Sequence, residues 1–230
     1  MNNKKYTIND YDLVIEKLIN YLKTKKFHFS TDDIDGRVNS IQNEKEIINL
    51  ILSSYKEIEI FQNWELKIYE QPRARYWYDI IIKNNDNSFY CPINIKISNF
   101  NIGSADNISS KEGLFFALTG LTSENCPNNW NEYFKLLSAN IKSNNTDYYF
   151  IIFDKSDTQK IVFNSLKRLK TLTPNGNNLP FQCKWSENDE RIERTFEESK
   201  EFLLGNLYES IKRRANILNE FHDVFIDFKK

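Results

Sequence analysis

Three polar residues in two neighbouring apolar segments could together form a reactive site. Asp79 stands at the start of the first segment, and Asn94 and Lys96 alternate with isoleucines in the second, Pro92–Ile97. Side chains two residues apart in a strand project from the same face, so Asn94 and Lys96 are expected to point one way and the isoleucines the other. If the strands pair antiparallel across the polar turn at residues 84–87, Asp79 would approach both across the ladder.

Such a group has the ligands and charges that phosphodiester cleavage requires. A hard divalent cation such as magnesium (Mg²⁺) prefers oxygen ligands, here the Asp79 carboxylate, the Asn94 amide and the Ile95 backbone carbonyl. The cation would polarise the phosphate and activate a water molecule for attack. Lys96 would hold or help deprotonate that water and offset charge in the transition state. The chain has only two histidines, so a metal-activated water is the simplest nucleophile.

The remaining sequence predicts the elements that would position these residues. The order of patterns predicts a mixed α/β class with a central mixed β-sheet flanked by helices. Asn43 with Glu46 fits a capping box at the start of the second helix, and the continuous apolar run 148–153 predicts a strand buried on both faces. Helices are expected at about 10–26, 43–55, 109–118, 130–141 and 193–219, and strands at 57–61, 64–69, 76–83, 89–98 and 148–153.

Composition excludes several classes of protein. A chain of 230 residues without a Pro/Gly/Ser-rich linker predicts a single domain over 1–230. Lys+Arg at 31 against Asp+Glu at 32 argues against a uniformly basic nucleic-acid binder, although a local basic patch stays open. No apolar run approaches the roughly 18 residues of a membrane span, and the polar start is unlike a secretion signal. The three cysteines lack CxxC spacing. We therefore expect a reduced cytoplasmic protein without membrane association.

Asp79, a short hairpin and Asn94-Ile95-Lys96 resemble the PD-(D/E)XK nuclease core, and specifically that of type II restriction endonucleases. The usual pattern is an Asp, a turn, and (Asp/Glu)-x-Lys on the next strand. Tyr78 stands where Pro is usual, and Asn94 replaces the second acid. Segments 104–120 and 172–182 are also similar to restriction enzymes. The resemblance spans about residues 39–182 and is greatest to the NgoBV/NlaIV-like group, whose members read GGNNCC.

A helix with an acidic residue usually precedes this core, and residues 40–46 look like it. On a helical wheel Glu44 falls within the apolar face, whereas Glu46 points away. An inward carboxylate is costly unless it is paired or binds metal, so Glu44 is the preferred third acidic group. The alternative is that Glu44 only stabilises the helix N-terminus through its dipole.

The resemblance implies a catalytic core at about 39–155, followed by a DNA-recognition loop and C-terminal helix at about 160–230. It implies a Mg²⁺-dependent site-specific deoxyribonuclease that cleaves double-stranded DNA at a short, palindromic site and leaves 5′-phosphate ends. It also implies a homodimer whose symmetry matches the site and a companion DNA methyltransferase. Two alternatives stay open: a repair or recombination nuclease with the same core, and a non-catalytic DNA-binding module. Asp79 and Lys96 could also form an ordinary ion pair.

Several residues outside the core are candidates for DNA contacts. Basic residues just before the Asp79 strand and at residues 167–170 could bind phosphates. The Asn-rich loop at 175–182 could contact base edges, although Asn and Gly also suit plain turns. The candidates are Arg73, Arg75, Ser109, Lys111, Lys170, Asn175, Asn177, Asn178 and Gln182. Lys167 and Arg168 complete the basic cluster with Lys170, and Ser109 or Ser110 could instead cap a helix.

Overall fold

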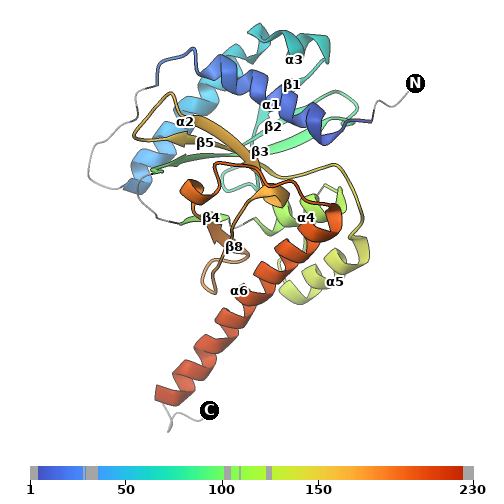
Figure 1. The fold of residues 1–230 in the computed structure, drawn as a ribbon, viewed down its shortest axis with the longest axis vertical. Helices are drawn as coiled ribbons and strands as arrows, with labels where there is room; N and C mark the ends of the chain where they lie inside the picture. Colours follow the sequence, from blue (N-terminus) through green and yellow to red (C-terminus); the bar gives the residue numbers. More distant parts are fainter. Residues whose placement is uncertain are drawn as a thin grey trace.

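A five-stranded mixed sheet is the centre of the structure, a computed structural model (Figure 1). The structure describes residues 5–27, 29, 36–100, 105–108, 110–122 and 126–224; for 36–41 and 222 it describes the backbone alone. The strands are β1 (Lys67–Glu70), β2 (Ile80–Lys83), β3 (Tyr90–Ser98), β5 (Tyr149–Asp154) and β6 (Ile161–Ser165), in the order β1-β2-β3-β5-β6. β3 and β5 are parallel and the other neighbours antiparallel.

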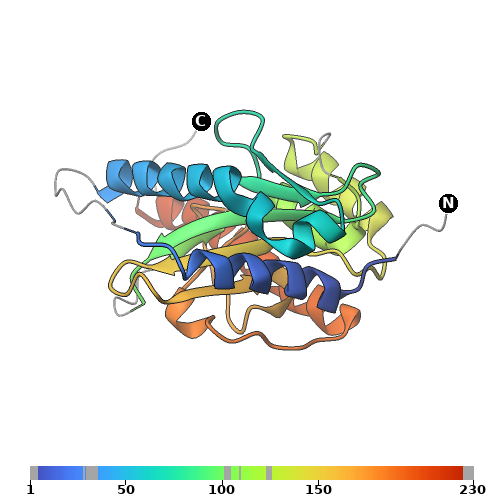
Figure 2. The same cartoon turned by 90° about the horizontal axis from the view of Figure 1, so that it is seen from above.

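Helices cover both faces of this sheet, which confirms the expected mixed α/β class (Figures 1 and 2). One face carries α1 (Ile8–Leu22), α2 (Gly36–Ser54), the 3₁₀ turn η1 (Tyr55–Glu57) and α3 (Glu59–Asn63). The other carries α4 (Lys111–Thr119), α5 (Trp130–Asn140) and α6 (Phe196–Val224). Because strand side chains alternate, Ile93 and Ile95 pack toward α1 and α2. Asn94 and Lys96 therefore face the side of α4.

A second, small sheet lies on the α4 side. It contains β4 (Asp106–Ile108), β8 (Phe181–Cys183) and β7 (Thr173–Pro174) in the antiparallel order β4-β8-β7. Its apolar residues belong to the same buried cluster as α4 and α6, whereas Asn107 pairs with Gln182 on the opposite face. The 3₁₀ turns η2 (Leu166–Arg168) and η3 (Trp185–Glu187) flank it in sequence. Strands this short give little periodicity, so the sequence did not predict this sheet.

Two sequence predictions for the sheet are confirmed. The polar turn at 84–87 joins β2 and β3 as a hairpin, and the Asn84 Oδ1 accepts a hydrogen bond from the Phe89 N–H at 3.0 Å. Every residue of β5 is buried, as expected for a central strand with helices on both faces.

One predicted strand and one predicted helix start are wrong. The segment 57–61 is not a strand, because Tyr55, Ile58 and Phe61 recur every three residues and are buried where η1 leads into α3. The second helix, α2, begins at Gly36 rather than Asn43, so Asn43 is buried inside the helix and does not cap it. The first two turns of α2 are mostly polar in sequence and lack the apolar periodicity that would have predicted a helix there.

Helix α6 packs on the body with one half and stands clear of it with the other (Figure 1). Leu203 and Leu207 are buried, whereas Ile217 and Leu218 are 49% and 60% exposed. Among the described residues, no helix combines the length and the apolar character that a membrane crossing requires.

Two glycines give a matched test of the packing on the α4 side. A Cβ at Gly113 in α4 would lie 2.5 Å from Cδ1 of the buried Tyr148 ring, whereas one at Gly205 in α6 would meet no described atom within 4 Å. We expect Gly113→Ala to lower the free energy of unfolding by about 1–3 kcal/mol. Gly205→Ala should raise it by about 0.5–1 kcal/mol, because alanine favours the helix. Urea denaturation measures both, and equal effects would contradict this packing.

Candidate active site

Asp79 lies directly before β2 and opposite Asn94 on β3. Its backbone N–H donates to the Ile93 carbonyl at 3.0 Å, and its carboxylate Oδ2 accepts the Ile95 backbone N–H at 2.6 Å. These bonds continue the register in which Ile80 pairs with Ile93. The Lys96 ammonium is close enough to lower the pKa of Asp79. The structure therefore brings the three predicted residues together on one face of the sheet.

The Asn94 amide oxygen is an unusual buried polar atom. It is buried and has no hydrogen-bond partner among the described residues. An unsatisfied buried acceptor costs about 1–3 kcal/mol unless something binds it. Next to it are the Asp79 carboxylate and Ile95, whose N–H and carbonyl both point toward the β2 side of the strand. These are hard oxygen donors, so the residues fit a cation such as Mg²⁺.

Glu44 approaches the same group from α2. It is half-buried while Glu46 is exposed, as the helical wheel predicts. Burial raises the pKa of Glu44 to about 7. This pKa includes the smaller effects of the ammonium groups of Lys96 and Lys155, which lower it, and of the Asp79 and Asp106 carboxylates, which raise it. Glu44 therefore lies within electrostatic reach of the predicted catalytic residues.

Burial also raises the pKa of Asp79, against the opposing effects of the Ile95 N–H and the Lys96 ammonium. Two partly desolvated carboxylates near one point favour a cation, because a positive charge stabilises their ionised forms. In the described part of the chain no three His, Cys, Asp or Glu side chains form a group that could hold a metal ion. A cation here would therefore depend on the Asn94 oxygen as well as on the acids.

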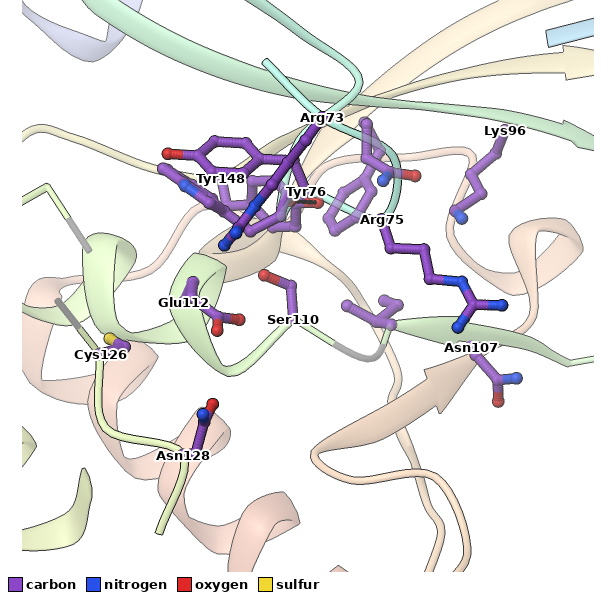
Figure 3. Close-up of a pocket in the computed structure, with 14 residues that line it drawn as sticks. Arg73, Arg75, Tyr76, Lys96, Asn107, Ser110, Glu112, Cys126, Asn128 and Tyr148 are labelled. Carbon is purple, nitrogen blue, oxygen red and sulfur yellow. Dashed lines mark hydrogen bonds between the residues drawn. The ribbon is translucent and has the colours of Figure 1, made fainter. Parts of the chain in front are cut away.

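A cavity of about 590 Å³ opens beside Asn94 and Lys96 (Figure 3). Loop residues Arg73 and Arg75 line it from one side, and Asn107 of β4 lines it from another. Asp79 and Glu44 are outside the set of described residues that line it. The cavity is thus a polar space directly next to the carboxylates, lined by three cationic side chains and by the Glu112 carboxylate.

The loop that carries the two arginines is fastened to Asp79. The Gln71 N–H donates to the Asp79 carbonyl at 2.9 Å, and the Gln71 Oε1 accepts the Tyr76 N–H at 3.2 Å. Arg75 adopts a left-handed backbone with φ of 60°, which is uncommon for a non-glycine residue. Arg73 and Arg75 are exposed at the cavity, where phosphate binding was predicted.

The other end of the predicted phosphate-binding region is less open to a ligand. The Lys111 ammonium donates to the Pro127 carbonyl and lies 5.8 Å and 5.7 Å from the ring centroids of Trp130 and Tyr133. Its contact with DNA stays a prediction. Ser109 lies outside the described residues. Ser110 caps α4 by accepting the Gly113 N–H at 2.7 Å, so the capping interpretation is confirmed for Ser110.

The predicted basic cluster at 167–170 is wrong as a surface feature. Lys167 and Arg168 are 6% and 4% exposed. The Lys167 ammonium donates to the Thr146 carbonyl at 2.7 Å, and Arg168 forms two bonds of 2.7 Å and 2.6 Å with the Asp12 carboxylate. Both side chains therefore form buried polar bonds inside the protein. A short run of basic residues in the sequence does not show whether these residues are buried or exposed. Lys170 alone is exposed and stays a candidate DNA contact.

The Asn-rich loop divides into internal and exposed residues. Asn175 and Gln182 hydrogen-bond to each other at 2.5 Å, whereas Asn177 and Asn178 are exposed. Arg214 of α6 holds the loop through the carbonyls of Gly176 and Asn177, at 2.6 Å and 2.9 Å. The loop is therefore anchored on both sides, and its contact with DNA stays a prediction.

Three residues near the site were missed from the sequence. Asp106 and Lys155 act on Glu44, and Asn107 lines the cavity. Lys155 could have been found, since it directly follows β5, and functional residues gather at the carboxyl ends of parallel strands. Asp106 and Asn107 depend on the three-residue strand β4, for which the sequence gives no pattern.

No protein-family model matches the chain, and no curated protein sequence is significantly similar to it. The function of the chain is therefore inferred from its site and from the motif in its sequence.

The buried carboxyl of Glu44 predicts a pH-dependent stability in chelator. Its pKa is about 7 in the folded protein and near the ordinary value of 4.5 when unfolded. Its destabilising effect is absent below pH 4.5, grows as the pH rises, and is complete above 7. We expect Glu44→Gln to raise the free energy of unfolding at about pH 8 by on the order of 2 kcal/mol, and to change it little at about pH 4.

The control for this measurement is Glu46→Gln, an exposed position on the same helix. It should change stability by only a few tenths of a kcal/mol at either pH. A Glu44→Gln protein with the same gain at both pH values would contradict the burial of this carboxyl.

Proposed function

We propose that this protein is a Mg²⁺-dependent type II restriction endonuclease with a PD-(D/E)XK-type core that cleaves double-stranded DNA at a short specific site. The observation that supports it most is the meeting of Asp79, Asn94 and Lys96 beside a cavity lined by arginines. A buried oxygen that has no hydrogen-bond partner in the described part of the chain lies in that group, and a carboxylate on α2 is within electrostatic reach.

Each residue has a role that its position supports. Asp79, the Asn94 amide oxygen and the Ile95 carbonyl would hold the cation, and Glu44 is the further carboxylate on the side of α2. When bound, Mg²⁺ polarises the phosphate and lowers the pKa of an attacking water. Lys96 would orient that water through its ammonium N–H groups and offset negative charge on the phosphate.

The charge distribution suits a duplex ligand. The net charge of −1 would not attract DNA over the whole surface. Arg73, Arg75 and Lys96 instead place positive charge around one cavity, where phosphates flanking the cut bond would lie. A homodimer on a palindrome, a companion methyltransferase and the site GGNNCC stay predictions of the resemblance.

Asn94 supports a second candidate function. With an amide in place of the usual second acid, and no cluster of three acidic, His or Cys ligands among the described residues, the chain could bind DNA without cutting it. DNA binding that persists in Mg²⁺ without strand cleavage would favour this candidate. Nicking restricted to branched DNA would instead favour a repair or recombination nuclease.

Plasmid cleavage tests the proposal directly. The wild-type protein should cut plasmid into discrete bands in Mg²⁺ and not in chelator. Lys96→Ala and Asp79→Ala should each lower the rate by at least about 100-fold, because each removes a charged group from the reacting centre. Lys56→Ala, an exposed lysine on η1, is the control and should cut at the wild-type rate. Unchanged cleavage by either active-site variant would remove its assigned role.

Restoring the second acid gives an independent prediction. Asn94→Asp places a third negative charge near Asp79 and Glu44, and cation affinity rises with the number of charged ligands. We expect Mn²⁺, measured by calorimetry, to bind about tenfold more tightly to Asn94→Asp and about tenfold more weakly to Asn94→Ala. If both variants bind Mn²⁺ like the wild type, Asn94 is not a ligand.

A further inference from the structure

Three side-chain amides form a continuous hydrogen-bonded chain across the small sheet. The Asn175 Nδ2 donates to the Gln182 Oε1 at 2.5 Å, and the Gln182 Nε2 donates to the Asn107 Oδ1 at 2.7 Å. Gln182 and Asn107 are direct partners on β8 and β4, so their side chains share one face. The chain ends at the cavity, where Asn107 is exposed.

The direction of donation along these three amides is fixed by backbone groups at the Asn175 end. The Asn175 Oδ1 accepts the backbone N–H groups of Asn177 and Asn178 at 2.8 Å and 2.9 Å. Backbone N–H groups can only donate, so the opposite end of the Asn175 amide must be its NH₂. That NH₂ requires an oxygen on Gln182, and the Gln182 NH₂ in turn requires an oxygen on Asn107. Each amide therefore has a single satisfactory orientation.

Because the Asn107 oxygen is engaged by Gln182, its NH₂ is the group available to a ligand in the cavity. Building on the proposed function, we propose that Asn107 is a specificity-determining residue that donates to an acceptor on a DNA base edge. Asn175 and Gln182 are then positioning residues that set the direction of this donor. Their expected role as direct base contacts is replaced by an indirect one.

This polarity selects one base over another. Asparagine usually binds adenine with its oxygen and its NH₂ together, accepting from N6 and donating to N7. The bond from Gln182 takes one of the two lone pairs of the Asn107 oxygen and turns that oxygen toward β8, which disfavours the paired contact with adenine. Guanine presents two acceptors and no donor in the major groove, N7 and O6, whereas adenine and thymine each present one acceptor and cytosine presents only a donor, so a lone donor suits guanine best and cytosine least. Asn107 should therefore favour guanine at one position of the bound site.

Two substitutions reverse the polarity by different routes. In Gln182→Glu the carboxylate accepts from both neighbours, so the Asn107 amide must turn its NH₂ inward and its oxygen toward the cavity. In Asn107→Asp one carboxylate oxygen accepts from Gln182 and the other faces the cavity. Both present an acceptor, which suits the cytosine amino group. The control is Gln62→Glu, which adds the same charge on α3, across the main sheet from β8.

The test is selection of bound duplexes from a randomised DNA library, with Lys96→Ala as the parent protein and Ca²⁺ present so that DNA is bound and not cut. The parent and the Gln62→Glu control should enrich guanine at one position. Gln182→Glu and Asn107→Asp should both lower guanine there by at least about fivefold and favour cytosine. Since the two variants act separately, a folding defect in one leaves the other decisive; thermal melting identifies such a defect.

Three results would overturn the inference: an unchanged base preference in a folded variant, an equal loss of affinity for every sequence, or a parent without any preference. The second of these would mark Asn107 as a phosphate contact. Plasmid cleavage by the wild-type protein is measured in parallel and decides the proposed function separately. A protein that cuts DNA while its Asn107 variants keep the parent preference retains the function and loses this inference.

Discussion

The hydrogen bond between the Ile95 N–H and the Asp79 carboxylate is the contact on which the site depends. This bond takes the place of a backbone–backbone bond of the sheet at the point where β2 begins. The Ile95 N–H on β3 is therefore hydrogen-bonded by a side chain and not by the main chain of β2. An ionised acceptor makes the bond stronger than a neutral one. It fixes the Asp79 carboxylate beside Asn94, and the bond from Gln71 fastens the arginine loop to the same residue.

Around this contact, the two faces of the sheet supply different parts of the site. Asn94 and Lys96 face the α4 side because the isoleucines between them fill the core beneath α1 and α2. Glu44 reaches the group from that core side. The apolar packing of the strands and helices thus keeps two carboxylates and an ammonium near one another. The buried Asn94 oxygen finds no hydrogen-bond partner among the residues that the structure describes, and leaving it unsatisfied costs free energy. For this reason we assign it a ligand.

The sequence predicts the parts of this arrangement that follow from short-range patterns. The alternation of polar and apolar residues predicted that Asn94 and Lys96 share one face of the strand. The Asn-rich turn predicted the β2–β3 hairpin, and the helical wheel predicted that Glu44 points inward. What failed depended on contacts distant in sequence. Lys167 and Arg168 read as surface charges, yet Arg168 binds Asp12, 156 residues away.

The small sheet shows the same limit. β4, with three residues, exists because β8 pairs with it, and only that pairing brings Asn107 to the cavity. A pattern within β4 could not have predicted it. The Asn-rich loop was predicted as a base-reading segment from residue types alone. The structure adds that Asn175 and Gln182 hydrogen-bond to each other and that Gln182 donates to Asn107, which residue types could not show.

The most direct measurement of the central claim is a crystal of the protein soaked in Mn²⁺ and examined for anomalous scattering. We expect a peak within bonding distance of the Asp79 carboxylate, the Asn94 amide oxygen and the Ile95 carbonyl, at about 2.0–2.4 Å. A peak elsewhere with these oxygens empty, or none at saturating Mn²⁺, would contradict it.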